Sequence, residues 1–198
     1  MKSSAALIIF LLGNLSVARP LRDVKFAGDG CPKESTDVVM TEDGETLSVL
    51  FEKFKAEVGG TTGQNTLRLK CDIEIPIDVP KGMGIAVYKL DYRGYHFLPK
   101  QGKALLGVEY DFGPHRSPKY HRLFDGEKKG EFTVTDTIGP AALKWLGCKG
   151  ETTTLSMRAF ITVDTNRQNE QAVFALDSAD GVKKTGGLHY RIRLKKCD

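Results

Sequence analysis

The chain has 198 residues, with 29 lysines and arginines against 25 aspartates and glutamates, and a formal net charge of +4. This charge is too small to indicate a nucleic acid or an anionic membrane as a partner. A composition of 40% hydrophobic and 27% charged residues excludes a wholly disordered chain, and the length suffices to bury one core.

The N-terminus has the pattern of a secretory signal peptide. Lys2 supplies the positive charge, residues 5–12 form an unbroken apolar run, and Ser16, Val17 and Ala18 are small residues before a cleavage point. The apolar run is far shorter than the roughly 20 residues of a spanning helix, so we expect no transmembrane anchor. We predict a signal peptide at 1–18 and a single secreted domain at 19–198, located extracellularly, or in the periplasm of a Gram-negative bacterium. Removal of the one lysine in that segment lowers the net charge to +3.

The predicted mature chain has four cysteines, Cys31, Cys71, Cys148 and Cys197. An even number behind an export signal predicts two disulfides. Structural zinc sites use ligand pairs two to four residues apart, whereas no two of these cysteines lie that close, so zinc is the weaker alternative. Three pairings exist, and we favour Cys31–Cys71 with Cys148–Cys197 because the two loops then do not cross.

In chain order, the sequence reads as β-structure almost throughout. The predicted strands are residues 36–41, 46–51, 67–75, 85–98, 105–112, 131–136, 152–164, 172–176 and 188–194. Residues 42–45 predict a hairpin turn between the first two. The clearest strand is 67–75, where apolar and charged residues alternate up to Pro76 and Pro80, which we expect to end it.

Helical patterns are scarce. Residues 140–146 predict one turn, and 51–58 is the only other segment with a helix-like pattern, ended by Gly59 and Gly60. The longest predicted loops are 61–65 and 111–121. The pattern predicts an all-β protein, an antiparallel β-sandwich of nine or ten strands with at most one or two short helical turns, and a flattened barrel as the alternative.

A series of ordered motifs resembles a known family of secreted proteins. They are residues 28–32 (GDGCP), 50–59 (LFEKFKAEVG), 70–71 (KC), 90–95 (LDYRGY), 130–136 (GEFTVTD), 143–148 (LKWLGC), 177–181 (DSADG) and Cys197. In this order they resemble the domain of unknown function 4360 over residues 24–197, nearly the whole predicted mature chain. The resemblance implies export and a β-rich domain with paired cysteines. It implies no reaction, so no catalytic residue is carried over, and this chain departs from the pattern by being more basic at 115–122 and at its C-terminus.

Aromatic and basic residues in the strand 85–98 form one candidate binding surface. Alternation places Tyr92 and His96 on one face and Arg93 and Tyr95 on the other. Exposed tyrosine and arginine on a sheet suit stacking against sugars or peptides. The alternative, which we favour, places the tyrosines in the core, with Arg93 paired to a carboxylate.

A basic segment supplies the other candidate residues: His115, Arg116, Lys119, His121 and Arg122. With the basic residues of 191–196, this segment could form one face for an acidic or sulfated polysaccharide or a phospholipid. A solvated loop and an edge strand guarded by cations is the favoured alternative. We expect no metal site, because His115 and His121 would need a folded-back loop and residues 177–181 lack the ligand spacing of a calcium loop.

No enzyme motif is present: the sequence has no Gly-x-Ser-x-Gly, no His-Glu-x-x-His and no phosphate-binding glycine loop. The leading interpretation is a non-catalytic binding or structural module at the cell surface or in the extracellular matrix. We expect it to use no cofactor and to contact a glycan or a protein. A secreted polysaccharide hydrolase and a secreted effector or toxin are the alternatives.

Overall fold

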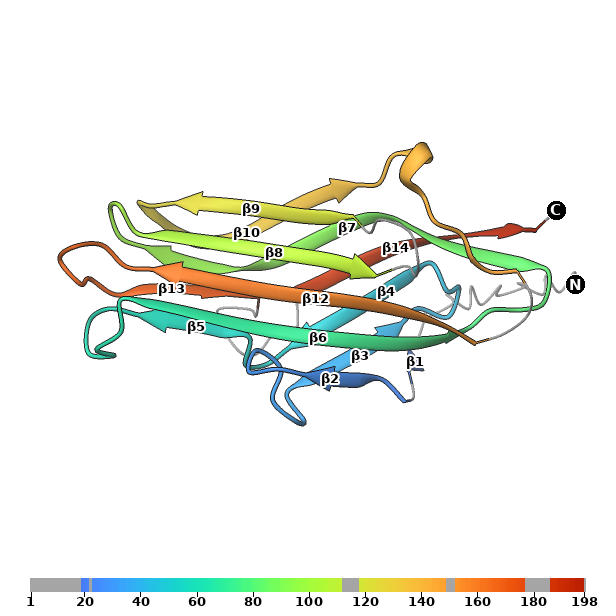
Figure 1. Ribbon diagram of the computed structural model, residues 1–198, viewed down its shortest axis with the longest axis horizontal. Coiled ribbons are helices and arrows are strands. Elements are labelled where there is room, and N and C mark those ends of the chain that lie inside the picture. The colour runs from blue at the N-terminus through green and yellow to red at the C-terminus, as the bar shows by residue number, and fades with distance from the viewer. Residues whose placement is uncertain (1–18, 22, 112–117, 149–151, 177–185, 198) are drawn as a thin grey trace, which may run out of the picture.

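The computed structural model describes residues 19–21, 23–111, 118–148, 152–176 and 186–197. Two antiparallel sheets pack face to face and do not close into a barrel, which confirms the predicted β-sandwich (Figure 1). The predicted signal peptide, residues 1–18, lies outside the described residues. Within the described residues, no helix has the length and apolarity needed to cross a membrane.

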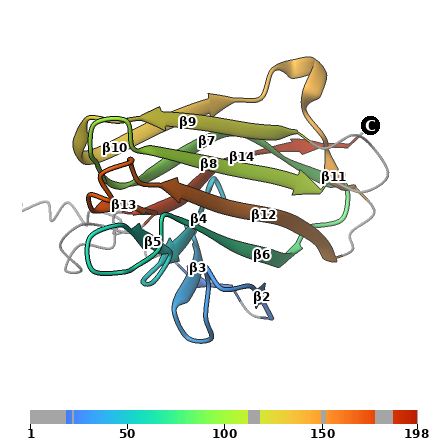
Figure 2. The same cartoon turned by 60° about the vertical axis from the view of Figure 1, so that its left-hand side comes forward.

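The smaller sheet has five strands. Their order is β2 (Lys25–Ala27), β6 (Thr66–Asp78), β12 (Thr152–Asp164), β8 (Lys103–Asp111) and β9 (Lys119–Asp125). These strands form the front layer in Figure 1, and the view in Figure 2 shows the same arrangement.

The larger sheet is organised around β7 (Met83–Leu98), the longest strand. Along one edge of β7 lie β14 (Gly187–Lys196) and β13 (Ala172–Ala175), and along the other lie β10 (Lys128–Thr137) and β11 (Leu146–Gly147). The sheet continues from β14 through β4 (Thr46–Phe51) and β3 (Thr36–Met40) to β1 (Arg19–Pro20), and from β13 to β5 (Lys55–Val58). Among the described residues, the one helical element is a 3-10 turn, η1 (Pro140–Ala142), inside the predicted turn 140–146.

The core follows from the alternation of the sequence. In β6, Cys71, Ile73 and Ile75 are fully buried, because residues two apart point to the same face of a strand. Strand β12 pairs with β6 along its whole length and alternates in the same way. The periodicity that predicted these strands therefore also selects the side chains between the sheets.

Three segments differ from the prediction. Pro76 does not end β6, which runs to Asp78. Among the strands that the structure describes, β2 pairs only with Asp72–Glu74 and leaves that edge of β6 unpaired at Pro76, and a proline is tolerated at such an edge. Residues 55–58, which have a helix-like pattern, form the strand β5, and the end of the predicted loop 111–121 belongs to β9.

Both predicted disulfides are present, joining Cys31 to Cys71 and Cys148 to Cys197. No cysteine in the described part of the chain is free. The first bridge is buried and attaches the segment before β3 to β6, whereas the second joins the end of β11 to the end of β14.

Four of the six tyrosines meet between the two sheets. Tyr110 of β8 makes edge contacts with Tyr120 and Tyr190, with ring centroids 6.1 and 6.0 Å apart. The hydroxyl of Tyr190 donates to the sulfur of Met157 at 2.7 Å. Burial raises the pKa of Tyr92, Tyr110 and Tyr190 far above the ordinary value of 10.0. We call Tyr92, Tyr110 and Tyr190 the tyrosine cluster.

Candidate binding surfaces

Near the end of β7, the aromatic side chains of Tyr95 and Phe97 are half-buried on the outer face of the larger sheet. Arg93 is also half-buried and shares their parity along the strand. Tyr92 has the opposite parity and is 1% exposed in the core. The candidate surface therefore keeps Arg93 and Tyr95 and loses Tyr92, whose ring fills the space between the sheets.

Neighbouring strands surround these two rings with polar groups. Lys129 and Glu131 of β10 lie opposite Phe97 and Tyr95, and the ammonium group of Lys129 stands 5.9 Å from the Phe97 ring centroid. On the other side, Val173 of β13 lies opposite Phe97, followed by Glu57 of β5. We call Arg93, Tyr95, Phe97 and these neighbours the Tyr95 face.

The far border of the Tyr95 face is held in place by side-chain contacts. Glu57 pairs with Lys55 at 2.9 Å and accepts a hydrogen bond from the amide of Gln171 at 2.6 Å. The contact with Lys55, followed by that with Gln171, lowers the pKa of the Glu57 carboxyl. The Tyr95 face therefore offers a fixed carboxylate, an amide and ammonium groups beside two aromatic rings.

His96 lies between Tyr95 and Phe97 in sequence but points to the interior. Its ring stacks on Phe132 with centroids 5.5 Å apart and contacts Phe124 edge-on at 5.7 Å. Burial, with a smaller contribution from Lys128, lowers the pKa of His96 below its ordinary value of 6.5. No described residue offers a hydrogen bond to its buried Nδ1. His96 supports the floor of the Tyr95 face and does not belong to its surface.

The basic segment does not form a single surface. His115 and Arg116 lie outside the described residues. Lys119 and His121 are exposed on the outer face of the smaller sheet, where Glu109 lies 3.1 and 3.9 Å from them. Arg122 points the other way, into the gap between the sheets, and pairs with the buried carboxylate of Asp136 on β10.

The described residues of this segment lie on a different sheet from the cations of β14. Strand β9 belongs to the smaller sheet and β14 to the larger one (Figure 2). The outer faces of two stacked sheets point in opposite directions, so the outward side chains of the two strands do not share one surface. The sequence pattern could not show this, because the connection from β9 to β10 crosses from one sheet to the other.

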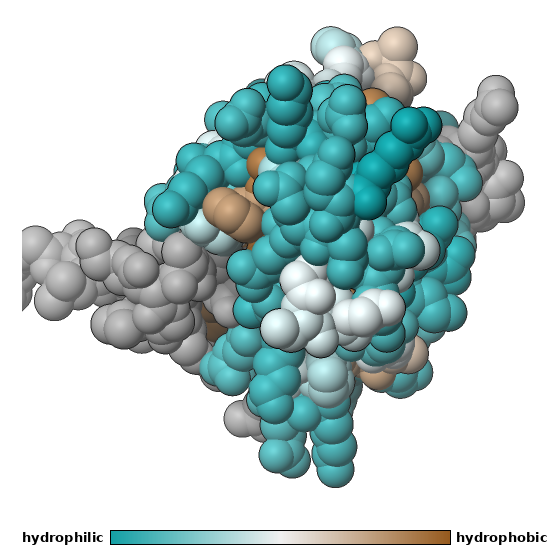
Figure 3. All heavy atoms as spheres, turned by 90° about the vertical axis from the view of Figure 1, so that its left-hand side faces the viewer, coloured by the Kyte–Doolittle hydropathy of each residue, from teal (hydrophilic) through white to brown (hydrophobic). Residues whose placement is uncertain are grey.

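Phe97 was missed by the sequence analysis. It lies two residues beyond Tyr95, and the same alternation that placed Arg93 and Tyr95 on one face also places Phe97 there. The end of the molecule near this part of β7, where β7 turns into β8, is mostly hydrophilic at its surface (Figure 3).

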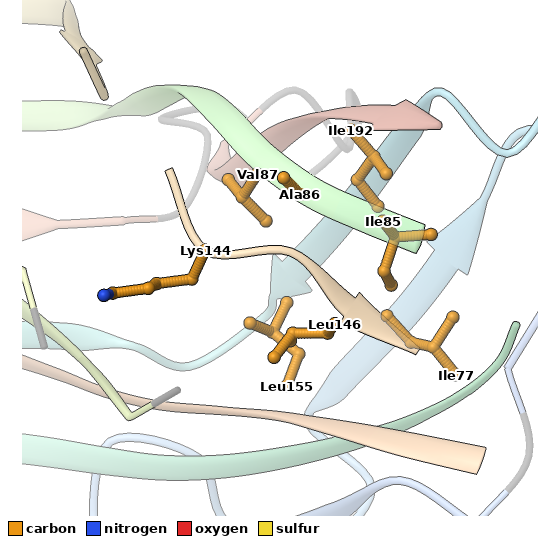
Figure 4. A pocket seen from close by; sticks show the side chains of 8 residues that line it. All are labelled: Ile77, Ile85, Ala86, Val87, Lys144, Leu146, Leu155 and Ile192. Carbon is orange, nitrogen blue, oxygen red and sulfur yellow. The ribbon is translucent and has the colours of Figure 1, made fainter. Parts of the chain in front are cut away.

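A hollow of about 10 Å³ lies between the sheets, lined by Ile77, Ile85, Ala86, Val87, Lys144, Leu146, Leu155 and Ile192. Figure 4 shows the apolar side chains meeting in it while the ammonium group of Lys144 points away. Such a space is about large enough for one water. In the described part of the chain, no three His, Cys, Asp or Glu side chains are arranged to hold a metal ion.

Comparison with solved structures gives faint likenesses to sugar-binding proteins. TmCBM61 in complex with β-1,4-galactotriose is 12% identical over 89% of this chain and 90% of that chain, with a TM-score of 0.30. A family 11 carbohydrate-binding module from Clostridium thermocellum, in complex with a mixed-linked tetrasaccharide, is 8% identical over 93% of both chains, with a TM-score of 0.23. TM-scores this low carry no argument about fold or ligand.

Comparison with curated proteins gives a relative in Arthroderma benhamiae, described as an uncharacterized secreted protein. The two are 23% identical over 158 residues, which cover 79% of this chain and 64% of the relative. This chain therefore spans less than two thirds of the relative's length. The relative's description and the two disulfides agree with the extracellular location that the sequence predicts.

The order of motifs from residue 28 to Cys197 predicted the family. The family described as a domain of unknown function, DUF4360, matches residues 20–197, and the chain therefore belongs to this family.

Proposed function

We propose that this secreted protein is a non-catalytic module that binds an extracellular glycan on the Tyr95 face. Residues 1–18 would be removed on export, leaving 19–198 as the mature domain. The observation that carries the proposal is the pair of half-buried rings, Tyr95 and Phe97, side by side on a rigid central strand.

The chemistry of the Tyr95 face suits a sugar. The flat face of a pyranose presents C–H groups, which pack against aromatic rings, while its hydroxyls need hydrogen-bonding partners around the rings. Glu57, Gln171, Lys129 and Glu131 supply such partners on both sides of β7. The cations and carboxylates of this border are nearly balanced, which favours a neutral glycan.

A protein partner is less well supported. Stable protein interfaces have a desolvated apolar centre, and the exposed large hydrophobic side chains of the described residues are Leu123 and Leu194. These two lie on different sheets and so cannot share one apolar patch.

Hydrolysis on the Tyr95 face is also less well supported. Glu57 and Glu131 are the carboxylates that flank the rings, and three strand spacings separate β5 from β10 across β13 and β7. At roughly 4.8 Å per spacing, with an offset of two residues along the strands, the backbone positions of these two residues lie about 16 Å apart. Glycosidases place their two carboxyl groups roughly 5–9.5 Å apart, so this pair has the wrong separation.

Titration of the secreted protein with a panel of soluble neutral polysaccharides, followed by calorimetry, tests the proposal. Tyr95→Ala and Phe97→Ala should each weaken binding of the best ligand about tenfold, equivalent to about 1.4 kcal/mol. Leu123→Ala is the matched control, because it also removes an exposed apolar side chain but on the opposite sheet. Equal affinity of Tyr95→Ala and the unsubstituted protein would remove the Tyr95 face as the site.

A further inference from the structure

A second surface lies at the other end of β7 and differs from the Tyr95 face in charge. Arg191, Arg193 and Lys195 of β14 are all exposed. Being two residues apart, they point to the same side of the sheet, at intervals of about 6.7 Å. They form a straight row of three positive charges along the outer face of the larger sheet.

Two aromatic rings lie directly under this row. The guanidinium carbon of Arg193 stands 4.7 Å from the centroid of the Tyr88 ring, and the ammonium nitrogen of Lys195 stands 4.6 Å from that of Trp145. Both rings are half-exposed. We call Arg191, Arg193, Lys195, Tyr88 and Trp145 the basic aromatic patch.

The backbone explains how the rings reach the cations. Arg191 pairs with Lys89 but Ile192 pairs with Val87, so Tyr88 is an extra residue in β7. A bulge of this kind re-aims a side chain, and here the Tyr88 ring reaches Arg193. Arg193 lies opposite Ala86, whose small side chain leaves room for a ring above the sheet, and Lys195 lies opposite Gly84, over which the sulfur atoms of Cys148 and Cys197 pack.

The positive charges of this row are not neutralised by neighbouring side chains. Among the described residues, none of Arg191, Arg193 and Lys195 forms an ion pair; Arg191 donates to the hydroxyl of Thr46 at 2.6 Å. The charge of Arg191 acts on the carboxylate of Asp43, in the turn between β3 and β4, which accepts hydrogen bonds from Thr41 and from the Glu45 amide. Away from the turn between β3 and β4, the positive charge of the row is therefore not compensated by a described ion pair.

We propose that the basic aromatic patch is a second binding site, for an anionic polysaccharide. The row of cations would pair with the repeated carboxylates or sulfates of such a chain, and the uncovered edges of the Tyr88 and Trp145 rings would pack against its sugars. A lipid surface fits less well because Leu194 is the one large apolar side chain exposed beside the row among the described residues, which leaves little to insert into a bilayer.

The site lends itself to a direct measurement, since Trp145 is the one tryptophan of the chain. Titration of the full secreted protein with oligogalacturonate should change the tryptophan fluorescence and give a dissociation constant that rises with salt. Arg193→Gln and Tyr88→Ala should each weaken binding about tenfold. Lys103→Gln, which removes an exposed cation from the smaller sheet, should change it less than about twofold.

Three further probes separate the proposal from its rivals. Polyglutamate carries carboxylates without sugar rings, neutral dextran carries rings without charge, and anionic phospholipid vesicles carry charge on a membrane. Binding of polyglutamate or vesicles as tight as that of oligogalacturonate would overturn the proposal, as would an unchanged affinity in Arg193→Gln. Tyr95→Ala should leave the oligogalacturonate titration unchanged, so the two sites can fail independently.

Discussion

The tyrosine cluster makes the fold sensitive to alkaline pH. Tyr92, Tyr110 and Tyr190 are at most 2% exposed, and their pKa values lie far above 10.0 because burial disfavours the phenolate. In the unfolded chain the same side chains ionise near pH 10. The folded state therefore binds more protons than the unfolded state above pH 10, and its free energy of unfolding falls as the pH rises.

The size of the effect follows from this difference. At pH 11 each tyrosine that ionises only in the unfolded state stabilises that state by about 1.4 kcal/mol, and at pH 10 by about 0.4 kcal/mol. The three together should lower the free energy of unfolding by about 4 kcal/mol at pH 11. This is a large share of the roughly 5–15 kcal/mol of a typical domain.

Urea unfolding followed by circular dichroism at pH 8, 10 and 11 measures the loss. Tyr110→Phe should reduce the loss at pH 11 by about a third, although it lowers stability at pH 8 as well. A titration of tyrosinate absorbance in the folded protein gives a second readout. If all six tyrosines ionised between pH 9 and 11 while the protein stayed folded, the reasoning would be refuted.

Three other substitutions test separate features of the fold. Cys148→Ser should lower the free energy of unfolding by about 4 kcal/mol, since Cys148–Cys197 closes a loop with a sequence separation of 49. Denaturant unfolding of the variant and the unsubstituted protein measures this difference. A difference below about 1 kcal/mol would contradict the expected role of the bridge. Gly107→Ala should lower the free energy of unfolding by about 1–3 kcal/mol, because its Cβ would lie 2.1 Å from the Phe160 ring. Gly139→Ala is the control and should leave the melting temperature nearly unchanged, because its Cβ would have no neighbour within 4 Å. Equal melting temperatures for the two variants would count against the predicted clash. Because the pKa of His96 is lowered in the folded state, the unfolded state takes up the proton first, and the melting temperature should fall as the pH drops below 6.5. His96→Phe should remove this fall. If the melting temperatures of the two proteins changed in parallel from pH 7 to 5, His96 would not be the group responsible.

The sequence predicted the parts of the fold in which one face of a strand is apolar and the other charged. Leu67 to Ile75 alternates along its length, and the structure buries Cys71, Ile73 and Ile75 as that pattern requires. The four residues of β5 are too short to distinguish a helical from a strand period. Their strand conformation is fixed by pairing with β13, which lies more than 100 residues later in the chain.

The candidate surfaces were predictable only in part, for a related reason. Alternation along β7 correctly separated Arg93 and Tyr95 from Tyr92, and would also have included Phe97. The basic aromatic patch could not be derived in this way, because Tyr88 meets Arg193 through a bulge and Trp145 meets Lys195 across β7 from β14. Contacts between distant segments depend on strand order and register, which local periodicity does not encode.

The two disulfides have a consequence for a protein attached to a surface or pulled by a polymer. A tension applied to the C-terminus passes from Cys197 through the sulfur atoms to Cys148, so the segment between them, with β12, β13 and β14, carries no load. The bridge from Cys31 to Cys71 shields β3, β4 and β5 in the same way. At about 3.4 Å per residue the two bridges withhold roughly 300 Å of contour length, so stretching should extend the chain between Cys71 and Cys148, roughly 260 Å, while the two closed loops stay unextended.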